Sequence, residues 1–86
     1  MQKLLAITLF DSKAGSFSQP FFVPSLPSAL RDFSILVNDG KSLQSQFAAD
    51  FDLYHIGSFD TSTGLFTRIE MKHIANGVDV KEVPHG

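Results

Sequence analysis

The chain has 86 residues and a formal net charge of −2, with nine Phe, one Tyr, no Trp and no Cys. A chain of this length predicts one domain, residues 1–86, with a small core. The absence of Cys excludes disulfides and thiolate catalysis. The acidic balance is unlike that of most nucleic-acid-binding proteins, which are basic because they neutralise phosphates. No apolar run approaches the roughly 20 residues that span a bilayer as a helix, so no membrane partner is expected.

The N-terminal part is predicted to begin with a buried strand. Residues 3–10 are apolar on both alternating faces, which favours a central strand over an edge strand. Residues 13–24 are predicted to be a loop, because Gly and Pro interrupt regular structure there. This loop nevertheless contains Phe and Val side chains, which either fold back onto the core or face a partner. The preference of large apolar side chains for burial favours the first alternative.

The next segment has the periodicity of an amphipathic helix over residues 26–38. Ser25 is a suitable N-cap, and apolar side chains, Phe33 among them, recur at helical spacing. The Asn-Asp-Gly sequence at its end predicts a C-terminal stop. Residues 42–49 predict a second helix of about two turns.

The C-terminal part is predicted to be a meander of three strands. Residues 51–59 and 65–75 are the first two, and alternation in the second places Leu65, Ile69 and Met71 on one face and the charged Arg68, Glu70 and Lys72 on the other. An Asn-Gly pair then predicts a tight hairpin into a last strand, 78–83, with residues 84–86 frayed. The elements together predict an α+β fold in two layers. It consists of a mainly antiparallel sheet of about four strands, with one main helix and one short helix on one face.

Residues with catalytic or metal-binding chemistry do not converge in the sequence. The three His are not spaced as metal ligands on one element, and neither a Gly-rich phosphate loop nor a nucleophile elbow is present. Asp50, Asp52 and Asp60 flank the strand 51–59, where turn and cap roles are more common than acid–base catalysis. The sequence therefore predicts neither an enzyme nor a bound metal or cofactor.

One group of residues is typical of a nucleic-acid-binding site, because aromatic and basic residues occur together in the predicted loop and main helix. They are Lys13, Phe17, Phe21, Phe22 and Arg31. Exposed rings stack on unpaired bases, and nearby cations follow the phosphate backbone. The alternative is that these rings fill a core or a dimer interface.

Several motifs in this region and beyond it resemble one known family. FDSKAG, PFFVP, ALRDF and VND occur in this order, followed by DFDLYHIGSFDTSTGLF. Over residues 10–66 the chain resembles the small non-structural, ORF5-type protein of gokushovirus-like Microviridae, which are single-stranded DNA bacteriophages. Phe51 stands where Tyr is usual in the family pattern. The resemblance implies a phage accessory protein in the cytoplasm of a bacterial host. Such proteins are described as DNA-binding, and are likened to a factor that turns replication from duplex to single-strand synthesis and packaging.

Two functions are consistent with these features. The first is a single-stranded DNA-binding protein acting in genome replication or in the switch to single-strand synthesis and packaging. The second is a protein–protein adaptor that engages phage replication, capsid or host proteins. A homodimer is compatible with either. For the first function, nine residues are candidate contacts to phosphates or bases: Lys3, Lys13, Phe17, Phe21, Phe22, Arg31, Lys41, Arg68 and Lys72.

Overall fold

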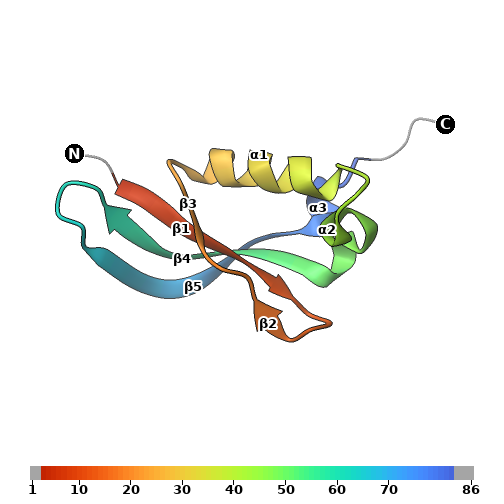
Figure 1. The fold of residues 1–86 in the computed structure, drawn as a ribbon, viewed down its shortest axis with the longest axis horizontal. Coiled ribbons are helices and arrows are strands. Elements are labelled where there is room, and N and C mark those ends of the chain that lie inside the picture. The colour runs from red at the N-terminus through yellow and green to blue at the C-terminus, as the bar shows by residue number, and fades with distance from the viewer. Residues whose placement is uncertain (1–2, 83–86) are drawn as a thin grey trace.

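The structure is a computed structural model that describes residues 3–82. It consists of one antiparallel sheet of five strands, with helices on one side of the sheet (Figure 1). The predicted two-layer α+β class is therefore confirmed. In chain order the elements are β1 (Lys3–Asp11), β2 (Ser16–Phe17), β3 (Phe21–Val23), α1 (Leu26–Val37), α2 (Leu43–Gln46), the 3-10 turn η1 (Ala48–Asp50), β4 (Phe51–Asp60), β5 (Phe66–Asn76) and α3 (Gly77–Val80).

Strand β1 lies in the middle of the sheet, as its two apolar faces predict. It pairs with β4 along one side, and with β3 and β2 in succession along the other. Strand β5 pairs with β4 and forms the outer edge. The register between β1 and β4 shifts after Ala6, where Ile56 is the extra residue of a bulge. A bulge of this kind lets two successive side chains point to the same face.

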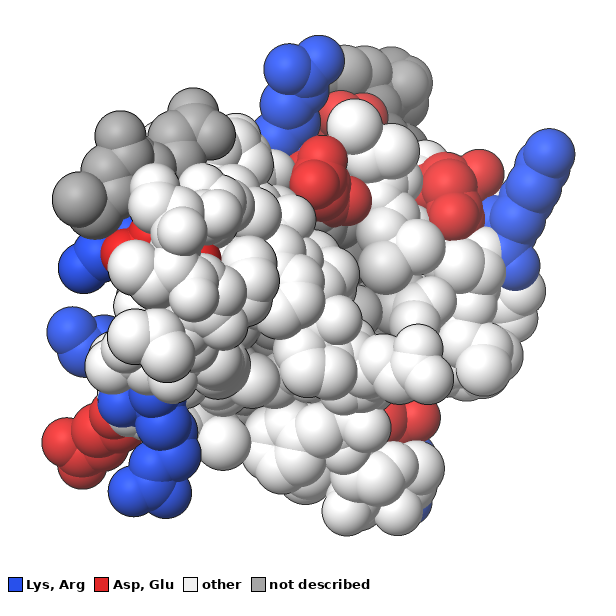
Figure 2. All heavy atoms as spheres, turned by 60° about the vertical axis from the view of Figure 1, so that its left-hand side comes forward, with Lys and Arg blue, Asp and Glu red and all other residues white. Residues whose placement is uncertain are grey.

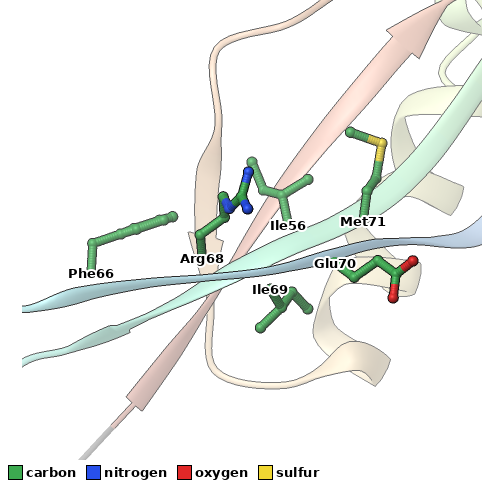
Figure 3. Close-up of a pocket in the computed structure, with 6 residues that line it drawn as sticks. All are labelled: Ile56, Phe66, Arg68, Ile69, Glu70 and Met71. Carbon is green, nitrogen blue, oxygen red and sulfur yellow. The ribbon is translucent and has the colours of Figure 1, made fainter.

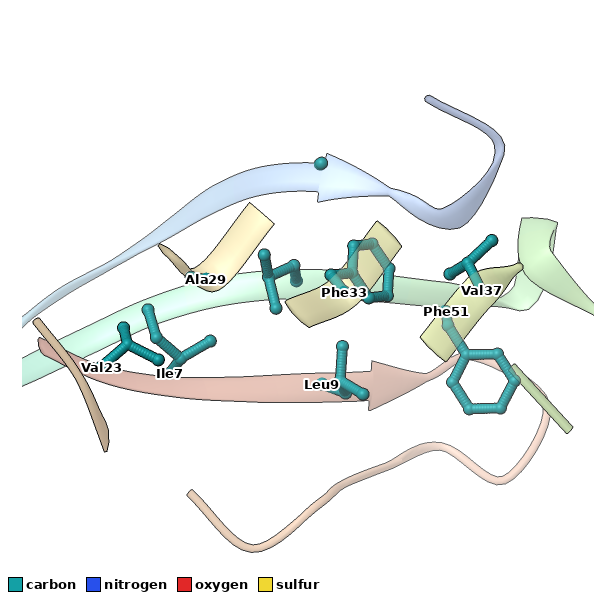
Figure 4. Packing of buried hydrophobic residues seen from close by; sticks show 9 residues of the cluster. Ile7, Leu9, Val23, Ala29, Phe33, Val37 and Phe51 are labelled. Carbon is teal, nitrogen blue, oxygen red and sulfur yellow. The ribbon is translucent and has the colours of Figure 1, made fainter. Parts of the chain in front are cut away.

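The core lies between α1 and the face of the sheet that α1 covers. Ala29, Phe33 and Val37 of α1 pack against Ile7 and Leu9 of β1 (Figure 4). The predicted helix is confirmed, because its apolar residues recur every three or four positions and so form one stripe. The predicted N-cap is also present, because the Oγ of Ser25 accepts a hydrogen bond of 3.3 Å from the backbone N–H of Ser28.

The prediction that residues 13–24 form a loop is wrong in part, because β2 and β3 lie within it. Pro20 and Pro24 flank β3 without entering it, and both short strands border β1 at the sheet edge, where Pro is tolerated. Phe21 packs against the core and Val23 is buried, whereas Phe17 remains half exposed. Folding back therefore applies to only part of this aromatic group.

The predicted last strand, 78–83, is wrong. Asn76 and Gly77 begin the short helix α3 instead of a hairpin. The Asn76 side chain accepts a hydrogen bond from Val78 N, and Asp79 accepts one from Asn76 N, so a capping box uses the Asn-Gly pair. A Cβ at Gly77 would overlap the carbonyl oxygen of Ala48, which explains why glycine is needed there. Val83 and the predicted frayed end, 84–86, lie outside the described residues.

The predicted second helix, 42–49, is present as α2 followed by η1. Before it, backbone N–H groups of Ser42 and Lys41 donate to the Asp39 carboxylate at 2.8 and 2.7 Å. These two hydrogen bonds hold the pKa of Asp39 below its ordinary value. Gly40 has a positive φ, 77°, in the turn that connects α1 to α2. Within residues 3–82, no helix has the length and apolar character needed to cross a membrane.

Candidate nucleic-acid interface

The face of the sheet opposite α1 is covered by none of the described helices (Figure 1). Residues that are directly opposite each other in an antiparallel pair point to the same face, so the register identifies the side chains on this side. Seven of them are aromatic, and we call this surface the aromatic face. Its rings are Phe10, Phe17, Phe22, Tyr54, Phe59, Phe66 and His73.

Four of these rings form a chain of contacts near the β1–β2 turn. The ring centroids of Phe10 and Phe17 are 4.7 Å apart, and those of Phe17 and Tyr54 are 6.0 Å apart. Tyr54 in turn meets His73 edge to face at 5.3 Å. Such separations are those of favourable aromatic pairs, so the rings hold one another in place.

A second cluster lies toward the other end of the sheet. Phe22 contacts Phe59 at 5.8 Å and Phe66 at 6.5 Å between centroids. Phe17, Phe22 and Phe66 each keep 48% of their surface exposed. These rings are therefore positioned by their neighbours and still offer a free face to a ligand.

Glycine at position 57 makes room for the second cluster. A Cβ on Gly57 would lie 2.6 Å from Cζ of Phe66 and 2.7 Å from the backbone oxygen of Thr67. The missing side chain thus lets the Phe66 ring lie against β4, at the position where the strand bulges.

Replacing Gly57 by alanine should lower the free energy of unfolding by about 1–3 kcal/mol, because the Thr67 backbone must move to accommodate the methyl group. Urea denaturation followed by circular dichroism measures this change. Ser58→Ala, at the next position of β4, is the control and should change stability by less than about 0.5 kcal/mol. Equal effects of the two substitutions would contradict the packing role of Gly57.

A hollow of about 650 Å³ lies beside Phe66, along β5. Figure 3 shows Ile56, Arg68 and Met71 on the same side of β5 as the ring, with Ile69 on the other side. The lining residues are Ile56, Phe66, Arg68, Ile69, Glu70 and Met71. The guanidinium of Arg68 is thus next to an exposed ring, the combination that binds an unpaired nucleotide.

The predicted alternation along β5 is wrong at this hollow. Apolar Met71 and basic Arg68 share a side, although the predicted alternation separates them. The reason is a register irregularity between β4 and β5, because three residues of β5 oppose only Ile56 of β4. An irregularity of this kind changes the side to which the following residues point.

The charges on the aromatic face are few and mixed. Arg68 contributes a cation, while Asp52 accepts hydrogen bonds from His73 at 2.9 Å and from Asn76 at 3.0 Å. Figure 2 shows the end of the molecule that lies at the left of Figure 1, and there too Asp or Glu side chains lie beside several of the Lys and Arg side chains. A ligand of this face would therefore be held more by ring surface than by charge.

The nine candidate contacts do not form one surface. Phe17, Phe22 and Arg68 lie together on the aromatic face, though in different parts of it. The other six lie elsewhere: Arg31 is on α1, Lys41 is in the turn before α2, Lys13 is in the β1–β2 turn, and Lys3, Phe21 and Lys72 are at strand positions that point to the helix side.

Several residues of the face are absent from the sequence prediction. Phe10 and Phe66 stand in strand segments, but Tyr54 and Phe59 are five residues apart on β4, so regular alternation would place them on opposite faces. They share a face because Ile56 is the extra residue of the bulge, and that bulge is visible only in the pairing of β1 with β4.

The described residues contain no group of three or more His, Asp or Glu side chains that could hold a metal ion. His55 Nε2 lies 3.0 Å from the carbonyl oxygen of Gly57, as a half-buried His in a strand usually finds a backbone partner. Asp60 accepts hydrogen bonds from Ser62 N and Thr63 N, which is the turn role predicted for it.

Comparison with known proteins adds one finding. A family model described as "Phage ORF5 protein" matches residues 4–80. No curated protein and no solved structure matches the chain.

Proposed function

The chain belongs to the phage ORF5 protein family, which makes it a phage accessory protein, and we propose that it binds single-stranded DNA through the aromatic face. In this proposal it acts in the genome replication of a gokushovirus-like phage, or in the switch to single-strand synthesis and packaging. The place of action is the cytoplasm of the bacterial host.

The observation that carries the proposal is the set of half-exposed rings beside Arg68 on an uncovered sheet. A ring stacked on an unpaired base contributes about 1–3 kcal/mol, and every base offers a flat surface for this contact. The rings stand on paired strands and touch one another, so little side-chain entropy is lost when a base stacks.

The same geometry favours single strands over duplex. The bases of a duplex are stacked on one another, so their flat surfaces are not free to meet Phe22 or Phe66. Duplex binding rests mainly on phosphate contacts, and the net charge of −2 disfavours these. Preference for single strands therefore follows from the ring surface and from the scarcity of cations.

The salt dependence of DNA binding tests which residues contact the phosphates. Arg68 is the one Lys or Arg on the described aromatic face, so the slope of log K against log salt should be about −0.7, the value for one contact to a single strand. Arg68→Ala should bring the slope close to zero and weaken binding about tenfold. Fluorescence anisotropy with a labelled oligothymidine at several salt concentrations measures both quantities.

Arg31→Ala is the matched control, because Arg31 is exposed on α1 and away from the aromatic face. It should leave affinity and slope unchanged. A steep slope in the unmodified protein, or equal losses in the two variants, would show that the DNA runs elsewhere. Absence of binding at low salt would refute DNA binding altogether.

The adaptor function remains the second candidate, and the net charge of −2 favours it. Half-exposed Phe rings beside Met71 also resemble the anchors that dominate protein interfaces. Under this alternative the face binds a phage or host protein of replication or packaging. The oligonucleotide measurement separates the two, since an adaptor would show no binding even at low salt.

A further inference from the structure

A second concave surface lies on the helix side of the sheet, between the β1–β2 turn and the segment from α2 to η1. Its volume is about 360 Å³, and we call it the hairpin groove. The groove is lined by Asp11, Lys13, Leu43, Phe47, Asp50 and Phe51. Phe51 belongs to the core under α1, so the groove is separate from the aromatic face.

The wall of the groove is apolar and open to solvent. Leu43, the first residue of α2, and Phe47, its C-cap, are 61% and 53% exposed. Large apolar side chains of a helix usually turn toward the core, as Phe33 and Val37 do on α1. Two that turn outward over a groove are typical of an interaction surface.

The charges around this wall are of both signs and are not paired with each other. Among residues 3–82 the ion pair within 4 Å is the one between His73 and Asp52, so Lys13 has no carboxylate partner there. The Asp11 carboxylate accepts backbone N–H groups of Lys13 and Ala14, which leaves its negative charge in place. The groove thus has one free ammonium and two carboxylates around an apolar middle.

This pattern is self-complementary. In a two-fold symmetric contact the same patch meets itself, so the Lys13 of each copy can face the Asp11 and Asp50 of the other. The exposed Leu43 and Phe47 of both copies would then pack together in the middle, away from water.

We propose that two copies of this chain associate through the hairpin groove. The dimer would leave both aromatic faces free, because the groove lies on the opposite side of the sheet. If those faces bind DNA as proposed above, one dimer holds a strand at two places and gains avidity. The association itself does not depend on the DNA-binding proposal.

Sedimentation velocity of the full chain across a range of concentrations tests the proposal. The unmodified protein should sediment as a dimer at roughly 100 µM. Lys13→Glu should raise the dissociation constant of the dimer at least tenfold, because the three carboxylates of one groove then face the three of the other. Asp50→Lys alone should also weaken it, and Lys13→Glu combined with Asp50→Lys should restore it. Lys72→Glu, the same charge change on β5, should have no effect.

Circular dichroism of each variant shows that it is folded, and rescue by the double exchange does so independently. A monomeric unmodified protein at this concentration would overturn the proposal. So would a dimer that survives Lys13→Glu, or one that dissociates on Phe22→Leu with Phe66→Leu, which would place the interface on the aromatic face. Loss of DNA binding with the dimer intact would count only against the proposed function.

Discussion

Replacing Phe33 by alanine should lower the free energy of unfolding by about 3–5 kcal/mol, the largest loss of stability expected from one substitution in this chain. Phe33 is 2% exposed and is among the largest fully buried side chains. It lies at the middle of α1, against the central strand, so neighbouring residues have little freedom to fill the cavity. A domain of this length has a total stability of roughly 4–13 kcal/mol, and the variant should be partly unfolded at 25 °C.

Urea denaturation followed by circular dichroism measures this loss. Ile35→Ala is the control on the same helix, because Ile35 is 60% exposed and its truncation leaves no cavity. It should change stability by less than about 0.5 kcal/mol. A Phe33→Ala protein as stable as the control would mean that α1 is not packed on the sheet as described.

Replacing Phe22 and Phe66 together by leucine should weaken single-stranded DNA binding by about 2 kcal/mol or more, roughly thirtyfold. Leucine keeps much of the apolar bulk at both positions but lacks the flat surface on which a base stacks. Both rings belong to one cluster and are half exposed, so their loss should affect the ligand more than the fold. Fluorescence anisotropy with a labelled oligothymidine measures the affinity.

The matched control for this pair is again Ile35→Ala, which removes exposed apolar surface from the helix side. Its DNA affinity should equal that of the unmodified protein. If the leucine variant bound DNA normally while remaining folded, stacking on the aromatic face would be disproved. Thermal denaturation of both variants verifies that each is folded at the temperature of the binding measurement.

Elements with a strong local signal were predictable from the sequence. The amphipathic stripe and the Ser25 cap predicted α1, and two apolar faces predicted that β1 is central. Both features depend on residues close together in the chain, where spacing and capping chemistry act without help from the rest of the fold.

Elements whose local sequence is compatible with two structures could not be predicted from the sequence. The Asn-Gly pair at position 76 suits a tight hairpin, but Asp79 and the nearby Ala48 carbonyl make it the start of α3. The segment 13–24 contains residues that interrupt strands, yet two short strands form in it because β1 offers an unpaired edge. In both cases a contact distant in sequence decides between local alternatives.

The sequence by itself determined that this chain has an α+β fold rich in Phe, with a covered core and too few cations to bind nucleic acid by charge alone. Only the tertiary structure decided which rings are exposed. The pairing of β1 with β4 and the irregular register of β5 assign each side chain to a face, and α1 covers one face only. A shift of one residue in register exchanges the two faces, so no local pattern could identify the aromatic face.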